Sequence, residues 1–152
     1  MIEDVVSAIG PYGGALIIGF VGGIVPIVWA ELFIGAMALS LGAVGPALAV
    51  AMLAAVGQMA ATAIRYWAGR GAANIPKGRL EKPFQKAQAK VEQWKDKPLA
   101  IIFLSSLVGF PPFYFIAILA GTFRLSFRAI MIVGGVARCL RFGAVALAPL
   151  LF

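Results

Sequence analysis

Residues 5–64 contain one formally charged side chain, Glu31, and this feature limits the fold more than any other in the sequence. Sixty residues of α-helix at about 1.5 Å per residue extend about 90 Å, close to three times the thickness of the hydrocarbon core of a bilayer. Over the 152 residues of the chain, 62% are hydrophobic and 12% are charged. Because a soluble domain of this size cannot bury so much apolar surface, the sequence predicts an all-α integral membrane protein.

The formal net charge of +7 is concentrated in one part of the chain. Seven of the 13 Lys and Arg residues lie within residues 77–97, and none precedes Arg65. Since basic clusters beside membrane spans mark the cytoplasmic side, we expect residues 69–97 to form a cytoplasmic insert. The N-terminus is then expected outside the cytoplasm or shallowly embedded. This distribution of charge favours membrane lipids over nucleic acid as the partner.

Cys139 is the only cysteine, and the sequence has no histidine. An intramolecular disulfide, the usual Cys/His zinc and haem ligand sets, and Ser-His or Cys-His nucleophile systems are therefore excluded. We predict no catalytic residues, no metal and no cofactor, and we expect that the protein is not an enzyme. Cys139 is interpreted as a small apolar filler rather than a reactive thiol.

Glycine and proline divide the apolar residues 12–45 into two pieces of about 14 residues each. A membrane-spanning helix needs about 20 residues, so we predict a re-entrant helical hairpin over residues 12–45, broken at Pro26 and Gly35. Such backbone is tolerated at membrane depth only where protein covers it or where it lines a cavity. The alternative is one long kinked span.

Residues 46–68 have the length and composition of a full transmembrane helix. Ala47, Ala51 and Ala55 recur at four-residue spacing on this helix and form a face suited to close helix packing.

The second apolar block, residues 98–122, is interrupted in a similar way. Two adjacent prolines remove two backbone donors and clash with the preceding turn, so a straight helix is not expected. We predict a second re-entrant hairpin here, followed by a transmembrane helix over residues 126–151. The predicted break positions are Gly109, Pro111, Pro112 and Gly121.

Residues 77–97, between the two apolar blocks, show helical periodicity. Leu80, Phe84, Ala87, Val91 and Trp94 share one face, and lysines lie off that face. We predict an amphipathic helix on an anionic leaflet, and the alternatives are a cap docked on the helix bundle and a calmodulin-target helix. The membrane-surface candidates are Lys82, Lys86, Lys90 and Trp94.

Each half of the chain therefore holds one hairpin and one transmembrane helix. The first transmembrane helix runs toward the cytoplasm and the second runs away from it, which predicts two inverted-topology repeats in a single membrane domain, residues 1–152. The amphipathic helix joins the repeats. Repeats of this kind hold their substrate near the bilayer midplane, where the broken helices meet.

The sequence YWAGR at residues 66–70 and the run FPPFYFIAILAGTFRLSFRAIMIVGGVARCLRFGAVALAP from Phe110 onward resemble the DedA family, also called the VTT or SNARE-associated Golgi protein family. The resemblance covers roughly residues 20–148. It implies an integral membrane protein with two facing re-entrant hairpins. It also implies movement of lipids between leaflets, including undecaprenyl phosphate in bacteria and phospholipids in eukaryotic relatives. On this basis we expect a bacterial or archaeal inner-membrane location.

The chain departs from the family's pattern at three places. Glu31 lies in PIVWAE, where many members resemble Pro-x-Pro-Ser-Glu, and Thr62 stands where an acidic residue often precedes the Tyr by four positions. Leu107 and Phe113 lie near places where arginines commonly flank the proline of the second hairpin. The proton-coupled transport of the best-known members is therefore not carried over to this chain.

Two arginines lie in the middle of the last apolar run. Arg138 is ten residues beyond Arg128, or about 15 Å along a helix, which is near the middle of a core about 30 Å thick. Arg141 follows one turn later on the same face. Since a guanidinium at this depth costs about 2.5–3.5 kcal/mol, both side chains must face protein, water or a partner. We infer that they take the place of the missing family arginines.

Glu31 is the one acidic residue within the apolar blocks, so it can pair with only one of these arginines. We predict that Arg138 and Arg141 hold a phosphate headgroup and that Glu31 is their counter-ion and a candidate proton site. The alternative is a permanent Glu31–arginine bridge that fixes the first hairpin. Arg65 is a further candidate, and snorkelling to the cytoplasmic surface is its alternative explanation.

The sequence thus predicts a DedA-like lipid translocase, a flippase or scramblase, that moves an anionic lipid headgroup, with polyprenyl phosphate as one candidate. A secondary transporter of a small soluble anion or ion is the first alternative. A non-transporting membrane scaffold is the second. A translocase of this size is expected to need a homodimer to shield its groove.

Overall fold

The computed structural model describes residues 2–25, 28–72, 97–109 and 113–152, and the regular structure within these ranges is entirely helical. The prediction of an all-α chain is therefore confirmed for the described residues. The predicted breaks Pro26, Pro111 and Pro112 and the amphipathic helix at residues 77–97 lie outside them. The helices are α1 (Ile2–Ile24), α2 (Ala30–Leu41), α3 (Val44–Ala72), α5 (Pro98–Val108), α6 (Phe113–Thr122) and α7 (Phe127–Leu151).

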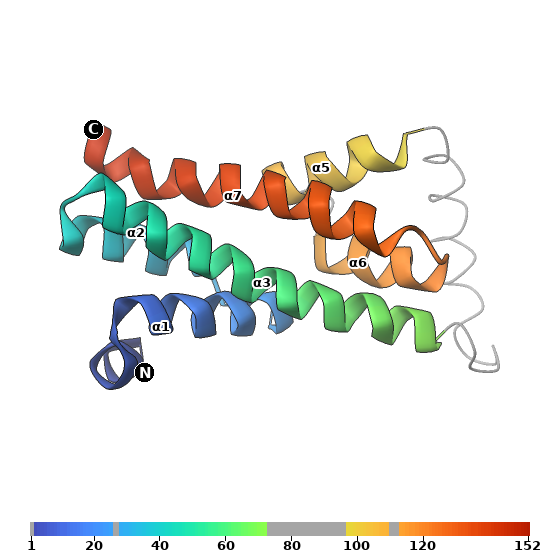
Figure 1. The fold of residues 1–152 in the computed structure, drawn as a ribbon, viewed down its shortest axis with the longest axis horizontal. Coiled ribbons are helices and arrows are strands. Elements are labelled where there is room, and N and C mark those ends of the chain that lie inside the picture. Colours follow the sequence, from blue (N-terminus) through green and yellow to red (C-terminus); the bar gives the residue numbers. More distant parts are fainter. Residues whose placement is uncertain (1, 26–27, 73–96, 110–112) are drawn as a thin grey trace.

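The two longest helices, α3 and α7, run antiparallel and pack against each other along the long axis of the molecule (Figure 1). With 29 and 25 residues, they extend about 43 Å and about 37 Å, enough to cross a bilayer. The sequence predicts spans over residues 46–68 and 126–151, and the helices occupy Val44–Ala72 and Phe127–Leu151. The hydroxyl of Ser126 caps the start of α7 by accepting a hydrogen bond from the Ala129 amide.

The pair α1 and α2 and the pair α5 and α6 approach each other from opposite ends of the molecule. In Figure 1, the end of α1 and the start of α2, and the end of α5 and the start of α6, lie near the middle of α3 and α7. The helices α2, α5 and α6 have 12, 11 and 10 residues, so each extends only about 15–18 Å. The middle of the bundle is therefore the place where helix ends gather.

The first helix begins earlier than the sequence analysis predicts. Helix α1 starts at Ile2, with Glu3 and Asp4 in its first turn, where acidic side chains favour a helix. Gly10 interrupts it with a φ of 76°, and the longer helical segment continues from Pro11 to Ile24. By length and composition, Ser7–Ile24 is a candidate span beside Val44–Gly71 and Phe127–Leu151. The described chain thus has three such helices, where the sequence analysis predicts two full spans.

Glycines allow α1 and α6 to lie directly against α3. A Cβ atom on Gly19 of α1 would overlap the backbone of Ala54, and one on Gly121 of α6 would overlap the carbonyl of Tyr66. Gly121 lies inside α6 and Gly35 lies inside α2, so the predictions that these two glycines break the hairpins are wrong. At Gly121 the missing side chain serves close helix contact rather than a turn.

The alanine face of α3 is used within the chain. Ala47, Ala51 and Ala55 are at most 1% exposed and belong to the core that α1, α2, α3 and α7 share. This face therefore does not provide the contact between two copies that a dimer requires.

Candidate functional site

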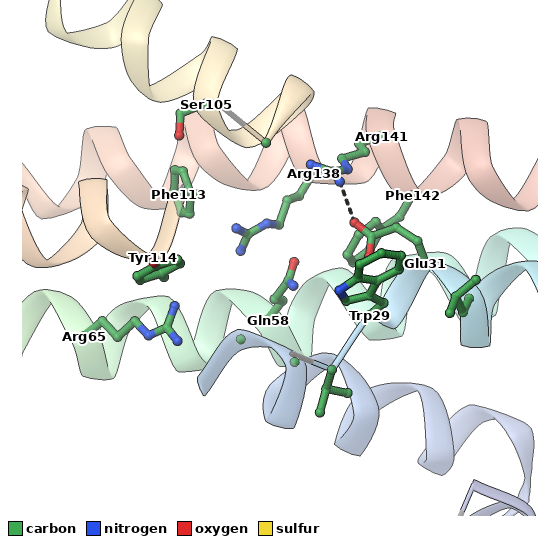
Figure 2. Close-up of a pocket in the computed structure, with 15 residues that line it drawn as sticks. Trp29, Glu31, Gln58, Arg65, Ser105, Phe113, Tyr114, Arg138, Arg141 and Phe142 are labelled. Atoms are coloured by element: carbon green, nitrogen blue, oxygen red, sulfur yellow. Dashed lines mark ion pairs between the residues drawn. The ribbon is translucent and has the colours of Figure 1, made fainter. Parts of the chain in front are cut away.

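A cavity of about 480 Å³ lies where the ends of α1 and α5 and the starts of α2 and α6 meet the middle of α3 and α7 (Figure 2). Each of the six described helices contributes to its wall. The charged and polar lining residues are Glu31, Gln58, Arg65, Ser105, Arg138 and Arg141, and the aromatic ones are Trp29, Phe113, Tyr114 and Phe142. The four residues that the sequence analysis selects for a substrate site, Arg138, Arg141, Glu31 and Arg65, all line this cavity.

The cavity carries more positive than negative charge. Three arginines and one glutamate line it, which gives a formal net charge of +2 (three minus one). Within the described residues, Glu31 and Arg141 form the ion pair of this site, with 2.7 Å between Glu31 Oε1 and Arg141 Nη2. The remaining two cations have other partners.

The Glu31–Arg141 pair joins the start of α2 to the middle of α7. Glu31 lies in the first turn of α2, and Arg141 reaches it from the middle of α7 (Figure 2). Both side chains are about 30% exposed (30% and 31%). On its other side Arg141 lies against Gly109, which ends α5 with a φ of 85°. A Cβ on Gly109 would lie 2.6 Å from Arg141 Nη1, so only glycine suits this turn in both its backbone conformation and its space.

Arg138 has a different environment, although it is only three residues away. It is 8% exposed and extends from α7 toward α3 (Figure 2). Its Nη1 lies 3.3 Å from the hydroxyl of Thr62 and 3.9 Å from the sulfur of Met59. Its guanidinium carbon lies 4.4 Å from the centre of the Phe113 ring, a cation–π distance. None of these partners carries a formal charge, and no described carboxylate forms an ion pair with Arg138.

Arg65 caps the C-terminal end of α1. It donates a hydrogen bond to the carbonyl of Ile24, the last residue of α1, and lies 5.2 Å from the centre of the Tyr114 ring. The last carbonyls of a helix have no partner within that helix, and a cation there also interacts favourably with the helix dipole. Arg65 therefore lies in the cavity wall, and it does not reach along the helix toward the membrane surface.

Sequence reasoning missed the neighbours of Arg138. Gln58 and Thr62 are polar residues within the otherwise apolar residues 46–64 of α3, and that contrast is the signal that could have identified them. Phe113 is 5% exposed beneath the guanidinium, and the sequence analysis does not anticipate its contact with a cation. Trp29 lines the cavity edge at 65% exposure.

The other candidates lie elsewhere. Ser106 donates a hydrogen bond of 2.8 Å to the carbonyl of Gly134 on α7, which connects α5 to α7. Cys139 is a free thiol of intermediate exposure, outside the lining of the cavity. Among the described residues, no group of three His, Cys, Asp or Glu side chains could hold a metal ion. The membrane-surface candidates Lys82, Lys86, Lys90 and Trp94 lie outside the described residues.

Comparison with known proteins gives one match. Residues 12–148 match the family model described as the VTT domain, and this stretch contains every residue that lines the cavity. No curated protein and no solved structure gives a match to this chain.

Proposed function

Because the chain belongs to the VTT domain family, we propose that it moves an anionic lipid headgroup, such as a polyprenyl phosphate, between the leaflets of its membrane. The observation that carries this proposal is Arg138, a buried guanidinium at mid-depth with no carboxylate partner among the described residues. It lies about 16 Å from the start of α7 and about 20 Å from its end, counted from Phe127 and Leu151.

The position of Arg138 supports a role beyond folding. A guanidinium at the centre of a bilayer costs about 2.5–3.5 kcal/mol or more, and hydroxyl, thioether and aromatic partners offset that cost only in part. A phosphate matches the planar fork of an arginine with two parallel hydrogen bonds. A headgroup phosphate would therefore supply the charge that Arg138 lacks, and Arg141 would contribute when it is released from Glu31.

The edge of the cavity supports a lipid rather than a soluble anion. Trp29 and Leu32 line the cavity and are 65% and 68% exposed, so large apolar side chains stand at its border. A lipid needs a path on which its headgroup enters polar surroundings while its tail stays in hydrocarbon. A border of this kind provides such a path.

We further propose that α1–α2 and α5–α6 are re-entrant hairpins of two inverted repeats. The support is an equivalence of contacts: Arg65 on α3 touches the end of α1 and the start of α6. Arg141 on α7 touches the end of α5 and the start of α2. Exchanging the two halves converts one set of contacts into the other. Three residues before each of these arginines stand Thr62 and Arg138, which contact each other.

In this arrangement the two arginines hold the two sides of the cavity. Release of the Glu31–Arg141 pair frees one pair of hairpin ends, and release of Arg65 from α1 frees the other. A phosphate that binds Arg138 competes with Glu31 for Arg141, which couples occupancy of the cavity to opening of one side. Such alternate opening around a fixed site is the usual behaviour of inverted-repeat transporters.

The test is leaflet exchange of a fluorescent anionic lipid in proteoliposomes, read by a membrane-impermeant reductant. We expect wild type to exchange the lipid and Arg138→Gln to slow exchange about 10- to 100-fold, since a charge-assisted hydrogen bond contributes about 1.5–3 kcal/mol. Thermal unfolding of both proteins shows whether the variant is folded.

If wild type exchanges neither an anionic phospholipid nor a polyprenyl phosphate, the proposal fails. Uptake of a small radiolabelled anion by the same vesicles would then favour a transporter of soluble anions. Absence of both activities would favour a membrane scaffold.

A further inference from the structure

One side-chain acceptor in the wall of the cavity is buried and has no hydrogen-bond partner among the described residues. The three cavity arginines offer only N–H groups, because a guanidinium has no acceptor. Within the described part of the chain, the side-chain oxygen Oε1 of Gln58 is buried and has no hydrogen-bond partner. Gln58 lines the same cavity and extends from α3 toward α7 (Figure 2). A buried acceptor without a partner costs about as much free energy as a lost hydrogen bond, so this oxygen requires a hydrogen-bond donor.

Gln58 is close to the binding position of Arg138. Arg138 contacts Met59, the next residue on α3, and Thr62, whose hydroxyl donates back to the Gln58 backbone carbonyl at 2.9 Å. An amide oxygen accepts hydrogen bonds and cannot donate them, so Oε1 of Gln58 needs a donor from its surroundings.

We infer that Gln58 is a specificity-determining residue that accepts a hydrogen bond from the headgroup, and that the site selects a phosphate monoester in its singly protonated form. This inference rests on the proposed function. A single –OPO₃H⁻ group offers oxygens to Arg138 and an O–H to Gln58 from neighbouring atoms of one phosphorus. A phosphodiester without hydroxyl groups offers the oxygens but no donor, and it leaves Gln58 unsatisfied.

The charge of the cavity separates this headgroup from the other lipid donors. An ammonium group, as in a phosphoethanolamine, could also donate to Gln58. The cavity carries a formal net charge of +2, however, and a third positive group beside Arg138 is repelled in a medium of low dielectric constant. A neutral hydroxyl on the phosphate itself meets no such repulsion.

The test compares two lipids that differ only in esterification. Phosphatidic acid is a monoester, and phosphatidylmethanol is a diester with no donor; both carry the same fluorescent acyl chain. We expect wild type in proteoliposomes to exchange phosphatidic acid about tenfold faster at pH 6. The preference should shrink toward pH 8, since the second proton of a phosphate monoester leaves near pH 6.

In Gln58→Leu, the ratio of the exchange rate of phosphatidic acid to that of the diester should fall to about one. Gln58→Asn keeps the amide but withdraws it by one carbon, and it should lose the preference with less disturbance of packing. Arg138→Gln is the contrasting variant, which should slow both lipids.

Three results would decide the matter. If wild type exchanges both lipids equally, or if Gln58→Leu and Gln58→Asn keep the preference, the inference is overturned while the proposed function stands. If wild type exchanges neither lipid nor a polyprenyl phosphate, the proposed function itself fails. A preference that is lost in both Gln58 variants supports the inference.

Discussion

Arg138 and Arg141 lie one turn apart on the same helix, and the environments of their guanidinium groups are opposite. Arg141 is 31% exposed and is neutralised by Glu31 at 2.7 Å, against the turn that Gly109 forms. Arg138 is 8% exposed and has a hydroxyl, a thioether and an aromatic ring as partners. The better-solvated arginine has the counter-ion, and the buried one has none among the described residues.

This distribution is the reverse of what stability alone would favour. Burial raises the cost of an uncompensated charge, so a structural role would give the carboxylate to the more buried guanidinium. The difference indicates that the two arginines have different roles. Arg141 and Glu31 hold the start of α2 against α7, and Arg138 remains available to bind a ligand. Three experiments on the described residues sharpen or break this comparison.

The largest effect on folding is expected from the ion pair. Glu31→Gln leaves Arg141 without its counter-ion, and we expect a loss of about 2 kcal/mol in the free energy of unfolding, less than for a fully buried pair because both ends are partly solvated. Arg138→Gln removes a buried cation without breaking an ion pair, so its stability should stay within about 1 kcal/mol of wild type.

Reversible unfolding in detergent micelles measures both variants, and the Glu31→Gln/Arg141→Gln double variant completes the cycle. A coupling energy near zero between Glu31 and Arg141 would contradict these separate roles. So would a larger loss of stability in Arg138→Gln than in Glu31→Gln.

A smaller effect is expected at the turn beside Arg141. Gly109→Ala combines a φ of 85° with a Cβ placed 2.6 Å from Arg141 Nη1, so it strains the backbone and displaces the guanidinium. We expect a loss of about 1–2 kcal/mol in stability.

Gly42→Ala is the matched control for this turn. Gly42 also ends a helix with positive φ, at 60°, but no atom lies within 4 Å of its Cβ position, so the control tests the backbone strain alone. If Gly109→Ala lowers the free energy of unfolding no more than Gly42→Ala does, the contact with Arg141 does not contribute to stability.

The smallest effect is expected at the polar contact of Arg138. Thr62→Val keeps the shape of the side chain and removes the hydroxyl that lies 3.3 Å from Arg138 Nη1. A single hydrogen bond contributes about 1 kcal/mol, so we expect exchange of an anionic lipid to slow about fivefold, with both the monoester and the diester affected. A variant that changes the ratio of the two lipids instead would assign the selection of the headgroup to Thr62 rather than to Gln58.

Periodicity and composition predicted the long elements well. The apolar runs in the middle and at the end of the chain correspond to α3 and α7 within four residues at each end, because length and hydropathy alone decide whether a segment can cross hydrocarbon. The sequence predicted the ends of the short helices α2 and α6 less well. Gly35 and Gly121 have the composition of breaks, yet they lie inside helices, because a glycine serves a turn and a close helix crossing equally well and the sequence does not distinguish the two.

The sequence by itself determined that this chain is a membrane protein, that its middle depth carries two arginines and one glutamate, and that one of the arginines must lack that carboxylate. These conclusions follow from counting charges along apolar runs, and they need no knowledge of which helices touch. Only the tertiary structure decided that Glu31 pairs with Arg141 and that Arg138 lies against Thr62, Met59 and Phe113. Those contacts join residues that are far apart in the chain. Two arginines three residues apart on one helix differ only in which neighbouring helix each of them faces. The packing of α2, α6 and α7 around α3 therefore decides which contacts each arginine makes.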